Sequence, residues 1–300
     1  MPASARTIAV ANGKGGVGKT TTTAHLGALA AEAGNRVLLV ELDVQGNLGE
    51  DLGYTGAGLS DEGEALYAAV RSGKPPVPLR NVRPNLDVVP GGAAVSLIPS
   101  ALDAYRRSGR ESTGAVGRCL APLAADYDLL FIDTPPIDAV VQEEALVAAA
   151  YLLIPTKTDA SSRKGLREMA QRFAAARTIN PTLTLLGVFL FGVTPGATRI
   201  RSAARTAIQA ELGAAAPVFD ATIRHVEAAA YDVRERGQLA HELERVVDAG
   251  PKWYERLRDG VDTPQLASSS ASLAGDFQAL TAETLAALVK AEASAAAVTA

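Results

Sequence analysis

The sequence predicts an α/β protein with a doubly wound, mainly parallel sheet that is flanked by helices. Apolar runs of strand length alternate with helical stretches along the chain, which is the order that builds parallel βαβ units. A glycine-rich loop separates the first apolar run, residues 7–10, from the first helical stretch, residues 22–31. In open parallel sheets, ligands bind at the carboxyl ends of the strands. The sequence therefore predicts both the fold class and the edge of the sheet that carries a site.

The glycine-rich loop matches the pattern of a phosphate-binding loop. Gly13, Gly18, Lys19 and Thr20 satisfy G-x-x-x-x-G-K-[ST] between a strand and a helix, the context that the pattern requires. Glycines let backbone N–H groups turn around an anion, and the helix that follows adds its positive end. Lys19 supplies charge for the outer phosphates, and the Thr20 hydroxyl can bind Mg²⁺. The residues predicted to hold the nucleotide are Gly13, Lys14, Gly15, Gly16, Val17, Gly18, Lys19, Thr20 and Thr21.

Two acids follow apolar runs of the same predicted sheet. Asp43 ends the run 36–43, and Asp133 follows four consecutive apolar residues, 129–132. Parallel strands bring their carboxyl ends to one edge, so both acids are expected beside the loop. An acid in this position is the Walker B arrangement, in which the carboxylate holds a water of the Mg²⁺ shell. The sequence therefore predicts a metal–nucleotide site in which Asp133 helps to hold the metal.

The loop is also more specific than a general phosphate-binding loop, because a second lysine, Lys14, follows its first glycine. The segment 14–21 resembles the deviant Walker A loop of the ParA/MinD family of ATPases. In that family the extra lysine reaches across a nucleotide sandwich dimer to the phosphates of the partner, and the resemblance implies this role for Lys14. The resemblance covers roughly residues 6–245 and implies ATP and Mg²⁺ as cofactors.

The segment 43–47 is similar to the Asp-x-Gln-Gly-Asn run of ParA proteins, in which the aspartate helps to activate the attacking water. Glu41 here replaces an aspartate that is common in the family, and Val44 replaces a proline. Asp43 itself is retained. The resemblance therefore implies that Lys14, Lys19 and Asp43 are catalytic, and that Thr20, Asp43 and Asp133 lie at the metal.

The function implied by the resemblance is that of a ParA-like ATPase that partitions DNA or positions another cargo. An ATP-dependent homodimer would bind DNA without reading its sequence, and hydrolysis stimulated by a ParB-like partner would release it. The net charge of −4 leaves DNA binding to a local patch. The candidate DNA-binding residues are Arg199, Arg201 and Arg224. We expect a cytoplasmic protein that associates with the nucleoid when ATP is bound.

Three other functions remain open. A MinD-like ATPase would use a membrane, but the terminal forty residues carry several acids against Lys290 alone, so a membrane partner is not expected. An interaction module could bind nucleotide without hydrolysing it, and a metabolic enzyme could phosphorylate a small molecule. The tetrapeptide 156–159 looks like the base-reading Thr-Lys-x-Asp of GTPases. In related GTPases that motif follows the next strand, here 185–194, where it is absent, so adenine is favoured.

Composition and spacing limit the remaining possibilities. The single cysteine, Cys119, is expected to be buried and excludes a disulfide framework or an iron–sulfur cluster. His25, His225 and His241 lack metal-site spacing. No run of the sequence has the length and apolar character of a membrane span.

We expect an ATPase domain in residues 1–260, followed in 261–300 by a Ser/Ala-rich linker, 264–275, and an amphipathic helix that docks on the domain or on a second subunit. Further strands are expected at 85–92, 150–155, 185–194 and 217–223, and further helices at 60–73, 101–125, 161–177 and 226–247.

Overall fold

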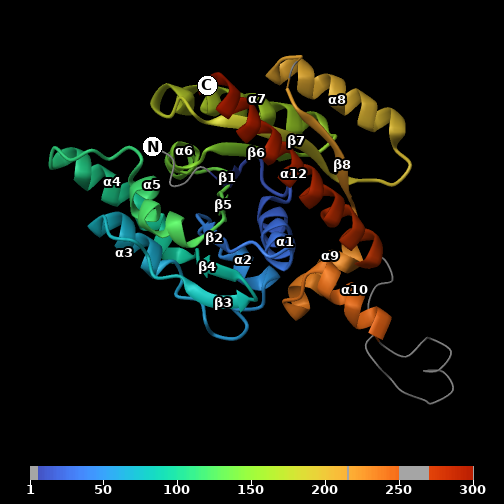
Figure 1. The fold of residues 1–300 in the computed structure, drawn as a ribbon, viewed down its shortest axis with the longest axis horizontal. Helices are drawn as coiled ribbons and strands as arrows, with labels where there is room; N and C mark the ends of the chain where they lie inside the picture. The colour runs from blue at the N-terminus through green and yellow to red at the C-terminus, as the bar shows by residue number, and fades with distance from the viewer. Residues whose placement is uncertain (1–5, 215, 250–269, 300) are drawn as a thin grey trace.

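A computed structural model describes residues 6–214, 216–249 and 270–299. Its strands form an eight-stranded sheet in the order β3-β4-β2-β5-β1-β6-β7-β8 (Figure 1). All neighbouring strands are parallel except β3 and β4, which are antiparallel. The predicted doubly wound, mainly parallel sheet is therefore confirmed. The strands are β1 Thr7–Val10, β2 Val37–Glu41, β3 Leu79–Arg83, β4 Leu86–Val89, β5 Leu129–Asp133, β6 Tyr151–Thr156, β7 Thr184–Val193 and β8 Val218–Arg224.

Helices cover both faces of this sheet (Figure 1). Successive residues of a buried strand point to opposite faces, so Leu39 of β2 packs in one core cluster and Leu38 in another. The first face carries α1 Lys19–Glu32, α2 Asn47–Asp51, α9 Glu227–Arg236, α10 Ala240–Ala249 and α12 Ser270–Thr299. The second carries α3 Glu64–Ser72, α4 Ile98–Arg107, α5 Ala115–Leu120, α6 Ala139–Ala148, α7 Ala160–Ile179 and α8 Thr198–Leu212.

The terminal helix α12 is part of the core. Phe277 and Leu280 are almost fully buried, and the helix packs against α1, α10 and β8. Of the two docking sites that the sequence left open, the domain and a second subunit, the structure shows packing on the domain. The predicted linker 264–275 is wrong for residues 270–275, which form the first turns of α12, because Leu273 and Ala274 bury their side chains there. The rest of that predicted linker lies outside the described residues.

Two of the predicted helices are divided. The predicted helix 226–247 is α9 followed by α10, because Gly237 adopts a left-handed φ of 59° at a close approach to Gly53. The predicted helix 101–125 is α4, α5 and a short 3₁₀ helix, Ala121–Asp126, and α4 and α5 are separated by a segment that contains Gly109 and Gly114, both at positive φ. Sequence reading also missed the short edge strand β3. Glycines that end helices at positive φ explain both breaks.

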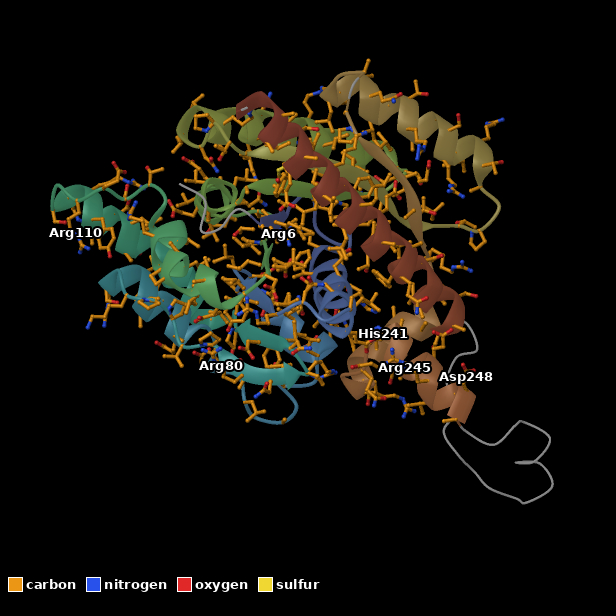
Figure 2. All side chains as sticks on the ribbon, viewed as in Figure 1. Arg6, Arg80, Arg110, His241, Arg245 and Asp248 are labelled. Carbon is orange, nitrogen blue, oxygen red and sulfur yellow. The ribbon has the colours of Figure 1, made fainter. Side chains whose placement is uncertain are left out.

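An ion pair and a buried histidine connect helix α10 to α1. Arg245 donates hydrogen bonds to both carboxylate oxygens of Glu32 at 2.8 and 2.6 Å, and His241 lies 3.2 Å from the same carboxylate. Figure 2 labels both α10 residues. On the other face, Cys119 of α5 is buried as predicted, and burial raises the pKa of its thiol to about 12. None of the helices described here is both long and apolar enough to cross a membrane.

Candidate active site

The phosphate-binding loop lies between β1 and α1 at the carboxyl edge of the sheet. Asn12 fixes it in place: its Nδ2 donates to the Pro155 carbonyl at 2.7 Å, and its Oδ1 accepts from the Lys14 N–H at 2.9 Å. Gly18 precedes α1 with a left-handed φ of 82°, and a Cβ there would lie 2.2 Å from the Phe191 ring. Glycine is therefore required at this position for two reasons, conformation and space.

Lys19, Thr20 and Asp133 meet below the loop. The Thr20 hydroxyl donates to Asp133 Oδ2 at 2.6 Å, and the Lys19 ammonium donates to the Lys14 carbonyl at 3.3 Å. Burial lowers the pKa of Lys19, against the opposing effects of Asp133 and Asp43. Burial raises the pKa of Asp133 to about 7, although Thr20 and Lys19 act in the opposite direction.

Asp133 fits a divalent cation. Its Oδ1 is buried and finds no hydrogen-bond donor within the described residues. A buried acceptor without a donor is costly, and a cation satisfies it without adding a protein group. Magnesium prefers oxygen ligands and keeps several waters. The Asp133 carboxylate and the Thr20 hydroxyl beside it are the oxygen groups that would hold such an ion.

Asp43 follows β2 at the same edge and is 5% exposed. Its Oδ1 accepts from the Gln45 N–H at 3.0 Å, and its carbonyl accepts from the Gly92 N–H at 3.0 Å. Its charge acts on the pKa of both Lys19 and Asp133, so the three groups lie within electrostatic reach of one another. The structure thus brings together Lys19, Thr20, Asp43 and Asp133, as the sequence predicted.

Glu41, which stands where the family commonly has an aspartate, positions the segments around Asp43. Its Oε1 accepts from the Leu48 N–H at 2.9 Å, and its Oε2 accepts from the Gly91 N–H at 3.1 Å. Burial raises the pKa of Glu41 well above its ordinary value. Sequence reading noted the substitution but not this role, which depends on Gly91 being folded back beside β2.

Lys14 does not extend over the loop. Its ammonium lies at the start of α7, where it contacts the carboxylate of Asp159 and the hydroxyls of Ser161 and Ser162. The tetrapeptide 156–159, which looked like a base-reading motif, therefore supplies the carboxylate that binds Lys14.

Two further contacts to the loop were missed. Gly165 of α7 packs against it so closely that a Cβ would lie 2.9 Å from Asn12 Oδ1 and 3.1 Å from Lys14 Cβ. Gln142 of α6 is buried and donates to the carbonyls of Asn12 and Pro135. A glycine inside the predicted helix 161–177 was the available signal, since such a glycine often marks close packing.

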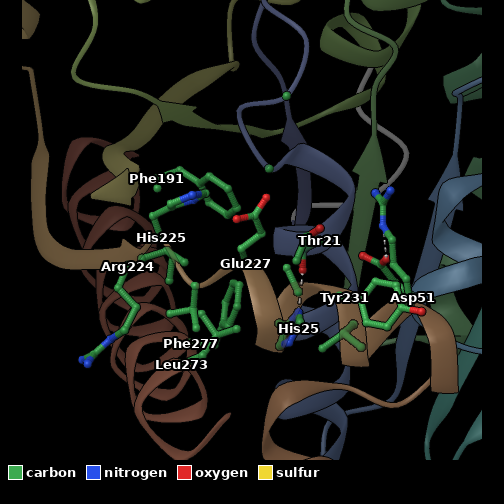
Figure 3. Close-up of a pocket in the computed structure, with 18 of the residues that line it drawn as sticks. Thr21, His25, Asp51, Phe191, Arg224, His225, Glu227, Tyr231, Leu273 and Phe277 are labelled. Carbon is green, nitrogen blue, oxygen red and sulfur yellow. Dashed lines mark hydrogen bonds and ion pairs between the residues drawn. The ribbon is translucent and has the colours of Figure 1, made fainter. Parts of the chain in front are cut away.

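A pocket of about 450 Å³ opens beside Thr21, at the outer end of the loop (Figure 3). This volume is in the range of small-molecule sites. Asp51 lines it, and its Oδ1 accepts from Arg234 Nε at 3.3 Å. The other labelled lining residues are His25, Phe191, Arg224, His225, Glu227, Tyr231, Leu273 and Phe277.

The three candidate DNA-binding arginines do not form one cluster. Arg199 and Arg201 lie on α8, where Arg199 is exposed and neither side chain pairs with an acid of the described chain. Arg224 ends β8, and its guanidinium donates to both Asp276 oxygens at 2.7 and 2.8 Å. Figure 3 shows this guanidinium directed away from the pocket. Of the three, Arg224 alone pairs with an acid of the described residues.

Comparison with known proteins places this geometry in a family. A family model described as an AAA domain matches residues 5–185. The chain is 34% identical over 194 residues to the chromosome partitioning protein ParA of Caulobacter vibrioides, which covers 62% of this chain and 68% of that protein. The chain belongs to the ParA family of partition ATPases. It is also 32% identical over 191 residues to the sporulation initiation inhibitor protein Soj of Bacillus subtilis, covering 61% of this chain and 71% of Soj.

Other relatives of this ParA-family chain are matched less completely or only in fold. The ParA protein of Myxococcus xanthus is 34% identical over 192 residues, and the match spans 64% of it, slightly under two thirds. Cobyrinic acid a,c-diamide synthase from Mycobacterium smegmatis, solved with ADP and magnesium, has a TM-score of 0.62 and 27% identity over 88% of this chain and 99% of its own. An ATP complex of Cyanothece McdA has a TM-score of 0.67 at 22% identity, covers 87% of this chain and 98% of its own, and shows the fold alone.

Proposed function

We propose that this chain is a Mg²⁺-dependent ATPase that ATP joins into a homodimer, and that the dimer binds DNA without sequence preference to partition DNA or position a cargo. The observation that carries the proposal is that Lys19, Thr20, Asp43 and Asp133 lie together at the carboxyl edge of the sheet, with the Lys14 ammonium at the neighbouring start of α7. A partner protein, ParB-like, would accelerate hydrolysis and so release the DNA. The protein would then act in the cytoplasm, on the nucleoid when ATP is bound.

ATP and magnesium suit the site on two grounds. The unpartnered Asp133 oxygen and the Thr20 hydroxyl fit the ion, and the pocket beside Thr21 has the size of a nucleoside site. The Mycobacterium smegmatis structure that shares this fold was solved with ADP and magnesium.

Each residue of the site has its own role in the proposed reaction. The loop N–H groups and Lys19 would bind the phosphates, and Lys14 of each subunit would reach those bound by the other. When bound, magnesium supplies positive charge to the outer phosphates. Asp43 would orient the attacking water, since it lies at the strand end beside this cluster and is nearly buried. Oriented groups in a site that excludes water are the main source of such catalysis.

The surface around the site suits a second copy of the chain. Ile137 is 83% exposed, Val44 39% and Val140 36%, and these residues follow β5 or β2 or begin α6 at the same edge as the loop. Exposed apolar side chains that gather on one face mark contact surfaces. Since this edge also carries Lys14, a face-to-face dimer would cover the apolar residues and place each Lys14 beside the other subunit.

The membrane alternative is not favoured. A membrane-targeting helix needs an apolar face that is free to enter lipid. In α12 the apolar residues Phe277, Leu280 and Leu288 are buried against the rest of the molecule. We therefore assign α12 to the fold and Arg199 and Arg201 of α8 to DNA contact, which would be salt-dependent.

The decisive experiment is the molar mass of the purified protein in ATP, ADP and a non-hydrolysable ATP analogue, each with Mg²⁺. We expect a dimer with ATP or the analogue and a monomer with ADP. Lys14→Ala should bind nucleotide yet remain a monomer, whereas Lys164→Ala, which removes an exposed lysine of α7, should dimerise normally. A wild-type protein that stays monomeric in every nucleotide would contradict the proposal.

A further inference from the structure

The Lys14 ammonium contacts three side chains at the start of α7. Its Nζ lies 2.7 and 2.9 Å from the two carboxylate oxygens of Asp159, 2.5 Å from the Ser161 hydroxyl and 3.2 Å from the Ser162 hydroxyl. An ammonium group has three N–H donors. These neighbours are enough to engage all three, so no donor is left for a phosphate.

The acceptor group is built into the start of α7. Asp159 is the N-cap of this helix and accepts from the Ser162 N–H at 2.9 Å, while the hydroxyls of Ser161 and Ser162 lie 2.6 and 3.1 Å from its oxygens. Burial raises the pKa of Asp159, but the hydrogen bonds from Lys14 and the two serines together lower it by more. The net shift of the Asp159 pKa is therefore downward. Asp159 is therefore a carboxylate at neutral pH and holds the ammonium by charge as well as by hydrogen bonds.

The backbone of Lys14 is held at the same place. Gly165, one turn further along α7, lies so close that an added Cβ would be 3.4 Å from the Lys14 N–H nitrogen. Both the backbone and the side-chain ammonium of Lys14 therefore lie against α7. The side chain is 27% exposed and that of Asp159 46%, so the pair is accessible from solvent.

We propose that Asp159 is a positioning residue that, with Ser161 and Ser162, retains Lys14 in its own subunit until ATP-dependent dimerisation transfers the ammonium to the phosphates bound by the other subunit. This inference rests on the proposed function. The contact competes with dimerisation, because the same three N–H groups cannot serve Asp159 and a phosphate together. It sets the ATP concentration at which dimers form and limits wasteful hydrolysis by single subunits.

Asp159→Asn separates this role from the role in the helix. Asparagine caps helices as well as aspartate does, so α7 keeps its N-cap while the negative charge is lost. Asp128→Asn is the matched control, since Asp128 forms an exposed ion pair with Arg36 just before β5, at the edge of the sheet opposite to the loop. Thermal melts of both variants check that each remains folded.

The measurement is the fraction of dimer against ATP concentration, by light scattering, in wild type and both variants. We expect Asp159→Asn to lower the ATP concentration at half-dimerisation about threefold to tenfold, because an ion pair this exposed is weak and two are broken per dimer. The difference should shrink in high salt, which screens ion pairs but not helix caps. Asp128→Asn should match wild type.

Equal ATP midpoints for wild type and Asp159→Asn would overturn the inference. So would loss of the dimer in Asp159→Asn, because Asp159 would then be needed across the interface. Both outcomes require a wild type that dimerises with ATP, so they are distinct from the failure of the proposed function, in which no nucleotide produces a dimer.

Discussion

Asp133 is fully buried, and its carboxyl group accepts a hydrogen bond from Thr20 on one oxygen only. The charges of Asp43 and Asp51 raise the pKa of the Asp133 carboxyl group, and Lys19 opposes them. Such an excess of acid in a buried site is unfavourable without a cation. The acids therefore provide the negative charge that suits magnesium, whereas Lys19 and the loop N–H groups provide the positive charge that suits phosphate.

Replacement of Asp43 separates binding from turnover. Asp43→Ala should bind ATP and form the dimer, because the phosphates are held by the loop, but phosphate release should fall about 10²–10⁴-fold, the usual contribution of a positioned acid–base group. Glu50→Ala removes an exposed acid a few residues along and should leave the rate unchanged. Phosphate release from Asp43→Ala at the wild-type rate would show that another group orients the water.

At the scale of an element, α7 supports the phosphate-binding loop. Its N-cap holds the Lys14 side chain, and Gly165 leaves room for the loop backbone. Arg172 of α7 also donates a hydrogen bond to Gln142. Gln142 in turn donates to the carbonyls of Asn12 and Pro135. The loop is therefore set by α6 and α7 as well as by its own glycines.

Gly165→Ala tests this support. The added methyl group would meet Asn12 Oδ1 at 2.9 Å and push the loop, so we expect the Kd for ATP to rise about tenfold, roughly 1.4 kcal/mol. Gly275→Ala is the control, because a Cβ there meets nothing within 4 Å and helical alanine should stabilise the fold by about 0.5–1 kcal/mol. Calorimetric titration with ATP gives both affinities. Unchanged ATP affinity in Gly165→Ala would mean that the loop adjusts without loss.

Helix α8 is the element assigned to DNA. Arg199→Ala with Arg201→Ala should weaken binding to arbitrary duplex DNA and lower the slope of log K against log salt by up to about 2, one for each phosphate that is no longer neutralised. Arg71→Ala with Lys74→Ala changes the net charge equally on α3 and the turn after it, and should have a smaller effect. If both pairs behave alike, attraction by overall charge accounts for binding, and α8 is not the DNA surface.

At the scale of the molecule, His25 connects α1, α10 and α12. It is fully buried, its ring stacks on Phe277 at 3.8 Å, and its Nε2 accepts from the Ala240 N–H at 3.1 Å. Nε2 is thus unprotonated, and Nδ1 donates to the Thr21 carbonyl at 2.8 Å. The neutral imidazole of His25 therefore contacts Thr21 at the end of the loop, Ala240 of α10 and Phe277 of α12.

This imidazole makes global stability depend on pH. Burial lowers the pKa of His25 to about 3, although the Thr21 hydrogen bond acts against it. The folded pKa lies below the unfolded value of about 6.5, so the contribution is complete above pH 6.5 and is lost as pH falls toward 3. Between pH 7.5 and 5.5 the wild type should lose about 1.4 kcal/mol more stability than His25→Gln.

Urea unfolding at the two pH values measures this difference. His225→Gln, which removes an exposed histidine of the same pocket, should lose as much as wild type. A His25→Gln variant with the full acid sensitivity of wild type would show that the destabilisation arises elsewhere.

The sequence by itself determined the fold class, the phosphate-binding loop and the acids beside it. Strand burial follows from runs of apolar residues, and the loop's chemistry follows from residue types at fixed spacing, so Gly18, Lys19, Thr20, Asp43 and Asp133 could all be placed in advance. Parallel strands then require their carboxyl ends to share an edge. Each of these steps uses neighbours in the chain or a rule of sheet topology.

Only the tertiary structure decided which distant side chains meet. Lys14 and Asp159 are 145 positions apart, and Arg224 and Asp276, which also pair, are 52 positions apart. The docking of α12 and the closeness of Gly165 to the loop likewise depend on how helices pack on the sheet. Sequence spacing does not predict such pairs. The burial, the charge environment and the space around each side chain are determined only when the helices pack on the sheet.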